Sequence, residues 1–172
     1  RNAGTCRANI RGIAAMAGET QRVMSEYNVV CDPEAADEVF NSGLPVFMGT
    51  YDITARLRMT MADVQQAFGA SDNPVHQVLH DCTQLWWGKV QGGRKAGPVL
   101  YDLVPIFWLA DQSSVKTRAA SIRVELRGQC TRGQTVRTGN SDNVMESLDL
   151  DADSMVREFV GTMRQARVRT EA

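Results

Sequence analysis

The sequence predicts an α/β fold, in which a mostly parallel open sheet is flanked by helices and an antiparallel hairpin lies near the C-terminus. Two observations support this. A capped helix over Pro33–Asn41 lies between two short apolar runs, Ile10–Met16 and Leu44–Met48, which is the order of a parallel strand–helix–strand unit. Later, Ser121–Leu126 alternates apolar and polar residues, and Gln134–Thr138 does so less cleanly, with glycines between them. Such a pair predicts the hairpin.

The helix between the two apolar runs has signals at both ends. Asp32 is a natural N-cap, Pro33 fits the first turn, and Gly43 supplies a stop. Ala36 and Phe40 are four residues apart and belong to one apolar face, so this helix is expected to pack against the sheet.

The middle of the chain is predicted to be helical. Helices begin at Thr60 and at Asn73, and in the second one the apolar residues from 75 to 86 step by three and four. Gln91–Pro98 is rich in glycine and predicts a flexible connection. A further helix is expected at residues 103–109, where Pro105 fits the first turn.

The C-terminal part is predicted to add one more strand and one more helix. Val144–Leu150 is predicted to form another strand. Asp151 or Asp153 can cap the last helix, whose buried stripe runs from Met155 to Met163. These aspartates lack the glycine and closing glutamate of an EF-hand loop, which favours capping over cation binding.

Composition excludes several classes of protein. The chain has 172 residues, of which 43% are hydrophobic, so a single domain with a core is expected and a disordered tail is excluded. The 19 basic and 20 acidic residues leave no positive surplus for binding nucleic acid. No apolar run approaches the roughly 18 residues that span a bilayer. The four cysteines form no C-x-x-C pair, which indicates reduced thiols packed as small hydrophobes in a cytosolic protein.

Polar residues follow the ends of the predicted strands, where open α/β sheets bind ligands. This rule nominates residues 19–28, residues 49–54 and Tyr101-Asp102. Glu26 and Asn28 flank one residue, so on extended backbone they point to the same side. A carboxylate beside a carboxamide suits vicinal hydroxyls. The alternative is that Asn28 satisfies a turn and Glu26 is solvated.

Residues 26–36 read EYNVVCDPEAA, residues 42–45 read SGLP, and residues 52–54 read DIT. In this order they resemble the E-F/Y-N, D-P-E-A-A and L-D-V-T block of the inosine-uridine nucleoside hydrolase family. Tyr101-Asp102 is similar to the family's later H-D-P-x-A block, and residues 131–136 (TRGQTV) to its t-R-G-x-t-v segment. The resemblance covers nearly the whole chain and corresponds to the second half of a family member.

The resemblance implies hydrolysis of the N-glycosidic bond of ribonucleosides to ribose and a free base. It also implies a calcium ion that carboxylates hold against the ribose hydroxyls, where it orients the attacking water. One aspartate of an N-terminal D-x-D-x-x-x-D-D motif is the base in such enzymes. Hard oxygen ligands suit calcium, and groups that grip the ribose stabilise an oxocarbenium-like transition state.

The resemblance also implies roles for individual residues. Glu26 is expected to take a ribose hydroxyl, the 5′ one. Asn28 is expected to bind the ribose beside it as part of the catalytic site. Met16 matches a methionine packed near the ribose, and Tyr101 completes the substrate-binding set. Asp102 is expected to be the single calcium ligand from this half of the enzyme.

Three departures from the family pattern matter. The N-terminal aspartate motif is absent from this chain. Tyr101 stands where many members have the histidine proposed to protonate the leaving base. The loop Ala17–Ser25 is short and lacks the family's G-N-x-T-P, so a second ribose-binding asparagine has no counterpart.

Other residues have competing interpretations. His76 and His80 are spaced i, i+4 on one helix and could bind a metal, but no glutamate motif completes a site, which favours a solvated or core-edge pair. Trp86 and Trp87 could stack on the base or serve in packing. Arg132-Gly133 is read as a turn rather than a phosphate site.

The sequence therefore predicts that residues 1–172 are the C-terminal part of a nucleoside hydrolase-like domain, with Glu26, Asn28 and Asp102 converging at one end of the sheet. The family activity is nucleoside hydrolysis, and the isolated chain is expected to be inactive because its calcium site is incomplete. The expected partners are a ribonucleoside and either a second copy or a missing N-terminal half, with no nucleic acid and no membrane. The expected location is cytoplasmic. The alternative is a truncated, non-catalytic chain that binds a partner or a ribose-like ligand.

Overall fold

The structure is a computed structural model that describes residues 8–90 and 96–167, and these residues form two compact units. The first unit comprises residues 8–55 and 101–150 and contains a four-stranded sheet. The second unit comprises residues 56–90, 96–100 and 151–167 and is mostly helical.

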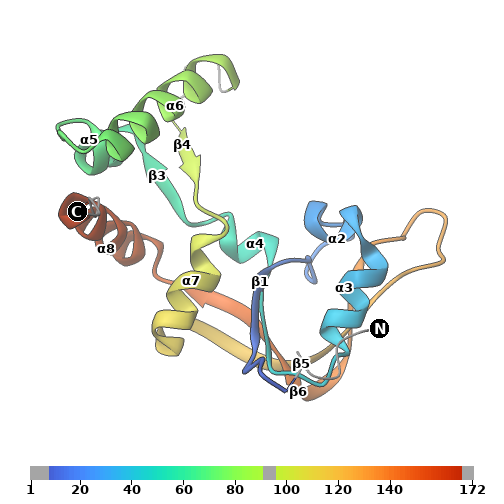
Figure 1. Cartoon of the computed structure of the whole chain (residues 1–172). Coiled ribbons are helices and arrows are strands. Elements are labelled where there is room, and N and C mark those ends of the chain that lie inside the picture. The colour runs from blue at the N-terminus through green and yellow to red at the C-terminus, as the bar shows by residue number, and fades with distance from the viewer. Residues whose placement is uncertain (1–7, 91–95, 168–172) are drawn as a thin grey trace. The chain divides into compact units, whose positions relative to one another are not determined.

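The first unit contains the strands and helices that surround the predicted site (Figure 1). In chain order they are β1 (Ile13–Met16), α2 (Tyr27–Cys31), α3 (Pro33–Phe40), β2 (Val46–Gly49), α4 (Tyr51–Thr54), α7 (Leu103–Ala110), the 3₁₀ helix η1 (Gln112–Ser114), β5 (Val115–Val124) and β6 (Thr135–Leu150).

The sheet confirms the predicted fold class. Its strand order is β1-β2-β6-β5, with β1 parallel to β2, β2 parallel to β6, and β5 antiparallel to β6. Ile13 pairs with Val46 and Met16 with Gly49, so β1 and β2 end at the same edge of the sheet. Helix α3 begins where predicted, because the Asp32 carboxylate accepts the amide of Ala35 at 3.0 Å.

Both faces of β2 are covered, which explains why its residues form a continuous apolar run. Phe47 stacks on Trp108 of α7 with 4.6 Å between the ring centroids. The next residue, Met48, points to the opposite face and joins Phe40 of α3 in the core. In Figure 1, α7 and α3 lie on either side of this sheet.

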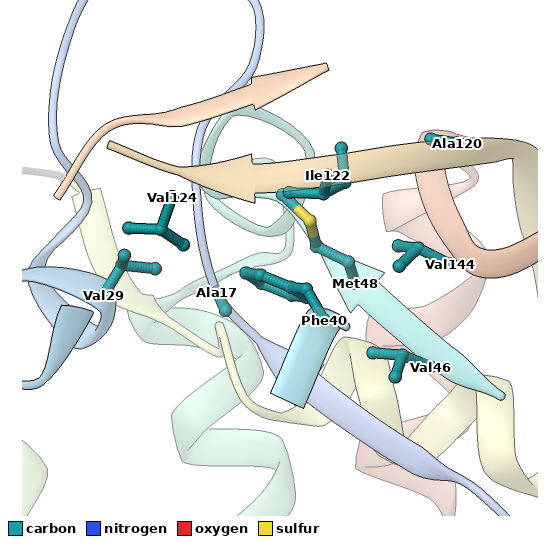
Figure 2. Packing of buried hydrophobic residues seen from close by; sticks show 9 residues of the cluster. All are labelled: Ala17, Val29, Phe40, Val46, Met48, Ala120, Ile122, Val124 and Val144. Carbon is teal, nitrogen blue, oxygen red and sulfur yellow. The ribbon is translucent and has the colours of Figure 1, made fainter. Parts of the chain in front are cut away.

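The core of the first unit lies between α3 and the sheet. Its buried members come from strands, helices and a loop far apart in the sequence, and Figure 2 shows their side chains directed toward one another. They are Ala17, Val29, Phe40, Val46, Met48, Ala120, Ile122, Val124 and Val144. Because Val144 pairs with both Val46 and Ala120, β6 joins the parallel part of the sheet to the antiparallel hairpin.

Three details of this unit differ from the sequence prediction. Val144–Leu150 is not a strand of its own but the second part of β6, which bends through register shifts against β5 near Ser121. Helix α2 was not predicted, because Glu26, which caps it, was assigned to extended backbone. Strand β1 begins at Ile13 rather than Ile10.

The second unit contains β3 (Arg58–Thr60), α5 (Met61–Phe68), α6 (Pro74–Val90), β4 (Ala96–Val99) and α8 (Ala152–Gln165). Thr60 and Asp63 form a capping box where the sequence predicted α5 to begin, and Asp151, one of the two predicted caps, caps α8. Phe68 of α5 and Phe159 of α8 meet edge to face, with 6.3 Å between the ring centroids. β4 pairs with β3, so the end of the predicted flexible connection is a strand; residues 91–95 lie outside the described residues.

Two features of the surface differ from expectation. The predicted apolar stripe of α6 is largely exposed, with Val78 60% and Leu85 57% accessible. Cys31, Cys82 and Cys130 are free and exposed rather than packed, and Cys6 lies outside the described residues. Among the helices that the structure describes, none is both long and apolar enough to span a bilayer.

Candidate functional site

A pocket of about 320 Å³ lies in the first unit, where β1 and β2 end. Seven residues line it: Met16, Glu26, Tyr27, Asn28, Tyr51, Tyr101 and Asp102. Every residue that the sequence nominated for the ribose or the metal is among them. Met16 ends β1, Tyr51 follows β2, and Asp102 precedes α7, which packs on both strands. Residues separated by 74 positions, Asn28 and Asp102, therefore share one pocket.

Glu26 is buried and binds backbone amides, a structural role that the sequence did not indicate. Its side chain is the N-cap of α2 and is only 3% exposed, so the solvated alternative is wrong. One carboxylate oxygen accepts the amide of Asn28 at 2.9 Å, and the other accepts the amides of Gly18 at 3.0 Å and Val29 at 3.3 Å. A carboxylate can accept about four hydrogen bonds, so this one retains capacity for one more donor.

Asn28 is oriented by the end of β1. Its Nδ2 donates to the carbonyl oxygen of Met16 at 3.1 Å and contacts Met16 Sδ at the same distance. These contacts fix the amide plane and leave Oδ1, an acceptor, on the exposed side chain. Asn28 and Glu26 do not lie side by side on extended backbone, as predicted, but on the first turn of a helix and its cap.

Asp102 is the N-cap residue of α7, but its side chain makes no capping hydrogen bond and is exposed. Its carboxylate therefore lines the pocket and does not cap the helix. The calcium ion implied by the family resemblance needs about six to eight oxygen ligands. Within residues 8–90 and 96–167, no group of three His, Cys, Asp or Glu side chains is arranged to hold a metal ion. The described residues therefore do not by themselves fit a calcium ion.

Tyr51 is a pocket residue that the sequence did not single out. Its ring stacks on that of Tyr101, with 5.9 Å between centroids and 18° between planes. The guanidinium of Arg22 lies 5.8 Å from the centre of the Tyr51 ring. A flat aromatic wall beside polar side chains can accept a planar ring by stacking. The signal was its place directly after the carboxyl end of β2.

The short loop Ala17–Ser25 is fixed to the sheet by buried polar contacts. The amide of Glu19 donates to Thr135 Oγ1 at 2.9 Å, and the Thr135 hydroxyl donates to the Glu19 carbonyl at 2.7 Å. The Thr20 hydroxyl donates to Glu146, a fully buried carboxylate that also pairs with Arg118 and Arg137. These contacts hold in place the loop that carries Arg22.

The remaining candidates lie in the second unit. His76 is 2% exposed and bonds to Ser71, while His80 bonds to Gln65 and Asp81, so the two histidines have different partners. Trp86 and Trp87 are half-buried on α6, and their stacking role remains a prediction.

Comparisons with known proteins identify the family of this chain. The family model described as inosine-uridine preferring nucleoside hydrolase matches residues 1–158. The pyrimidine-specific ribonucleoside hydrolase RihA of an Enterobacter species is 32% identical over 84% of this chain and 48% of its own length. The Salmonella arizonae protein of the same name is 32% identical over 77% of this chain and 44% of its own length. The chain thus spans about half the length of these curated relatives.

Solved structures give the same result for the fold. A purine-preferring ribonucleoside hydrolase from Gardnerella vaginalis superposes with a TM-score of 0.78 at 23% identity, covering 88% of this chain and 51% of that one. An inosine-uridine preferring nucleoside hydrolase from Bacillus anthracis superposes with a TM-score of 0.73 at 17% identity, covering 94% of this chain and 53% of that one. With the family model matching most of its length, this chain belongs to the inosine-uridine preferring nucleoside hydrolase family.

Proposed function

We propose that this chain is the ribonucleoside-binding, C-terminal part of a nucleoside hydrolase that cleaves N-glycosidic bonds. The observation that carries this proposal is the convergence of Met16, Glu26, Asn28, Tyr101 and Asp102 on one pocket. The relatives are named for purine or pyrimidine ribonucleosides, and the pocket combines hydroxyl-binding groups with aromatic rings, which suits a ribonucleoside.

In this proposal each side chain has a limited task. The exposed Oδ1 of Asn28 accepts a ribose hydroxyl, and the remaining acceptor capacity of Glu26 takes the 5′-hydroxyl near the amides that it already binds. Tyr101, stacked on Tyr51, contacts the base. Fixed groups of this kind hold the ribose as positive charge develops on it.

Asp102 supplies one oxygen ligand to a calcium ion in the proposed enzyme, and the other ligands and the general base come from residues outside this chain. A lone exposed carboxylate holds calcium weakly because hydration competes with it. The chain alone is therefore expected to bind ribonucleosides without hydrolysing them, and to act in the cytoplasm with a complementary N-terminal half or a second copy.

The test is an assay of ribose release from inosine and uridine with millimolar calcium, first with the chain alone. The N-terminal half of a related enzyme is then added. We expect no turnover alone, turnover on mixing, and loss of that turnover in Asp102→Asn but not in Asp153→Asn, which changes an exposed aspartate on α8. Turnover by the chain alone that Asp102→Asn abolishes would contradict the half-enzyme proposal.

The second candidate is a non-catalytic chain that binds a ribose-like ligand. It would use the same pocket, in which the exposed Asn28 amide and the stacked tyrosines can contact a ribose-like ligand without a metal ion. Saturable uridine binding by the chain, with no turnover after mixing, would identify this function.

A further inference from the structure

A second group of polar side chains lies in the other unit, around the start of α6. Two adjoining hollows there share Ala70, Ser71 and Arg164; one, of about 490 Å³, is also lined by Asn73 and Arg167. The other, of about 420 Å³, is lined by His76. Neither belongs to the pocket described above, and the proposed hydrolysis does not use them.

His76 has an unusual position. Its side chain is 2% exposed, its ring packs against Phe68 with 5.8 Å between centroids, and its Nδ1 lies 2.8 Å from Ser71 Oγ. The other ring nitrogen, Nε2, is buried and has no hydrogen-bond partner among the described residues. A buried polar atom without a partner is costly, which points to a group that the site is built to receive.

The hydrogen bonds of Ser71 allow a tautomer of His76 in which Nδ1 accepts the Ser71 hydroxyl proton and Nε2 carries the proton of the ring. Ser71 Oγ accepts the amide of Asn73 at 3.1 Å, so its own proton is available for Nδ1. If Nδ1 is the acceptor, the neutral ring carries its proton on Nε2, and the unpartnered atom is a donor. A donor in this position calls for an acceptor oxygen.

The charges around this donor select the kind of acceptor. The guanidinium of Arg164 lines both hollows and makes no hydrogen bond or ion pair with the described residues. Arg167 lines one of them, and Asp72 is the only acidic residue among those lining either hollow in the described part of the chain. α6 begins here and is 17 residues long, so its positive end adds to the field of the arginines.

We propose that these hollows form a binding site for an oxyanion of the phosphate class, in which Arg164 and the Nε2–H of His76 donate to phosphate oxygens. Free phosphate and the phosphate group of a sugar phosphate share this chemistry. The site shares no lining residue with the ribonucleoside pocket.

The test is a titration of the isotope-labelled chain with inorganic phosphate. The chemical shifts of the backbone amides of residues 71–77 are measured, and chloride at matched ionic strength serves as the reference. We expect saturable chemical-shift changes. Arg164→Gln should weaken the phosphate affinity about tenfold, since a charged hydrogen bond is lost. Arg157→Gln, which changes an exposed arginine of the same helix outside the hollows, should leave the affinity unchanged.

Two substitutions of His76 separate its two nitrogens. The amide of glutamine can occupy the place of Nε2, whereas that of asparagine can occupy only the place of Nδ1. His76→Gln should therefore retain phosphate binding better than His76→Asn. Equal shifts with chloride, or equal loss in Arg164→Gln and Arg157→Gln, would overturn the proposal. If the chain binds ribose 5-phosphate at least about tenfold more tightly than inorganic phosphate, the ligand is a sugar phosphate. Equal affinities for the two would identify free phosphate as the ligand.

Discussion

Glu26 and Gly18 are joined by a hydrogen bond in which the Gly18 amide donates to Oε2 at 3.0 Å. Gly18 lies just beyond β1, and Glu26 caps α2, so this bond sets the shape of the loop that carries Arg22. Gly18 has a φ of +74°, a backbone conformation that favours glycine. The carboxylate that we propose to bind ribose thus also holds the backbone beside it.

Gly18→Ala is expected to lower the free energy of unfolding by about 1–3 kcal/mol. A Cβ at this position would lie 2.6 Å from Met48 Cε and 2.8 Å from Thr135, in addition to the strained φ. Gly161→Ala is the matched control, since its Cβ would meet nothing within 4 Å on a helix, and it should stabilise the chain by up to about 1 kcal/mol. Urea unfolding measures both, and equal stabilities of the two variants would contradict the expectation.

Glu26→Gln is expected to destabilise the first unit by about 1–3 kcal/mol, because an amide group would face backbone N–H donors that now meet a carboxylate oxygen. The comparison is Glu38→Gln, which changes an exposed glutamate of α3 and should alter stability little. Chemical denaturation monitored by tryptophan fluorescence would report the difference. An unchanged midpoint for Glu26→Gln would mean that the capping contacts contribute little.

The hairpin turn is expected to weaken in acid. Hydrogen bonds from the amides of Arg127 and Gly128, at 2.7 and 3.0 Å, lower the pKa of Glu125. A folded-state pKa below the unfolded one gives stability that is present above the ordinary glutamate value, about 4.3, and lost as the pH falls through the depressed value. Amide protection near Gly133, measured relative to the intrinsic exchange rate at each pH, should therefore fall below that range, and Glu125→Gln should remove this pH dependence of the protection. An equal acid response in Glu125→Gln would assign it to other carboxylates.

The sequence predicted the parallel unit around α3 because its signals are local: Asp32 and Pro33 start a helix without help from distant residues. It failed for α2, whose cap Glu26 also bonds Gly18, eight residues away. β4 was missed for a similar reason. Its residues are poor strand formers, and pairing with β3, of Arg58 with Val99 and of Thr60 with Ala96, specifies the strand.

For the candidate site, the family motif nominated residues that the structure brings to one pocket, although their separation in sequence gave no such indication. Within the nominated residues 49–54, Tyr51 was not singled out because it departs from the motif: the family block has leucine before the aspartate, where this chain has tyrosine. Only the fold shows that its ring lies on Tyr101.

Tyr51 therefore provides a test of the base-binding part of the pocket that does not require a complete enzyme. If the stacked pair of Tyr51 and Tyr101 receives the base, Tyr51→Leu should weaken uridine binding by about threefold to tenfold, the contribution expected of one aromatic contact. Tyr51→Phe keeps the ring and should retain the affinity, which separates stacking from any role of the hydroxyl. Titration of the labelled chain with uridine and with ribose measures both. Ribose lacks the base, so its affinity should be the same in all three chains; a parallel loss of ribose binding in Tyr51→Leu would show instead that the leucine distorts the pocket.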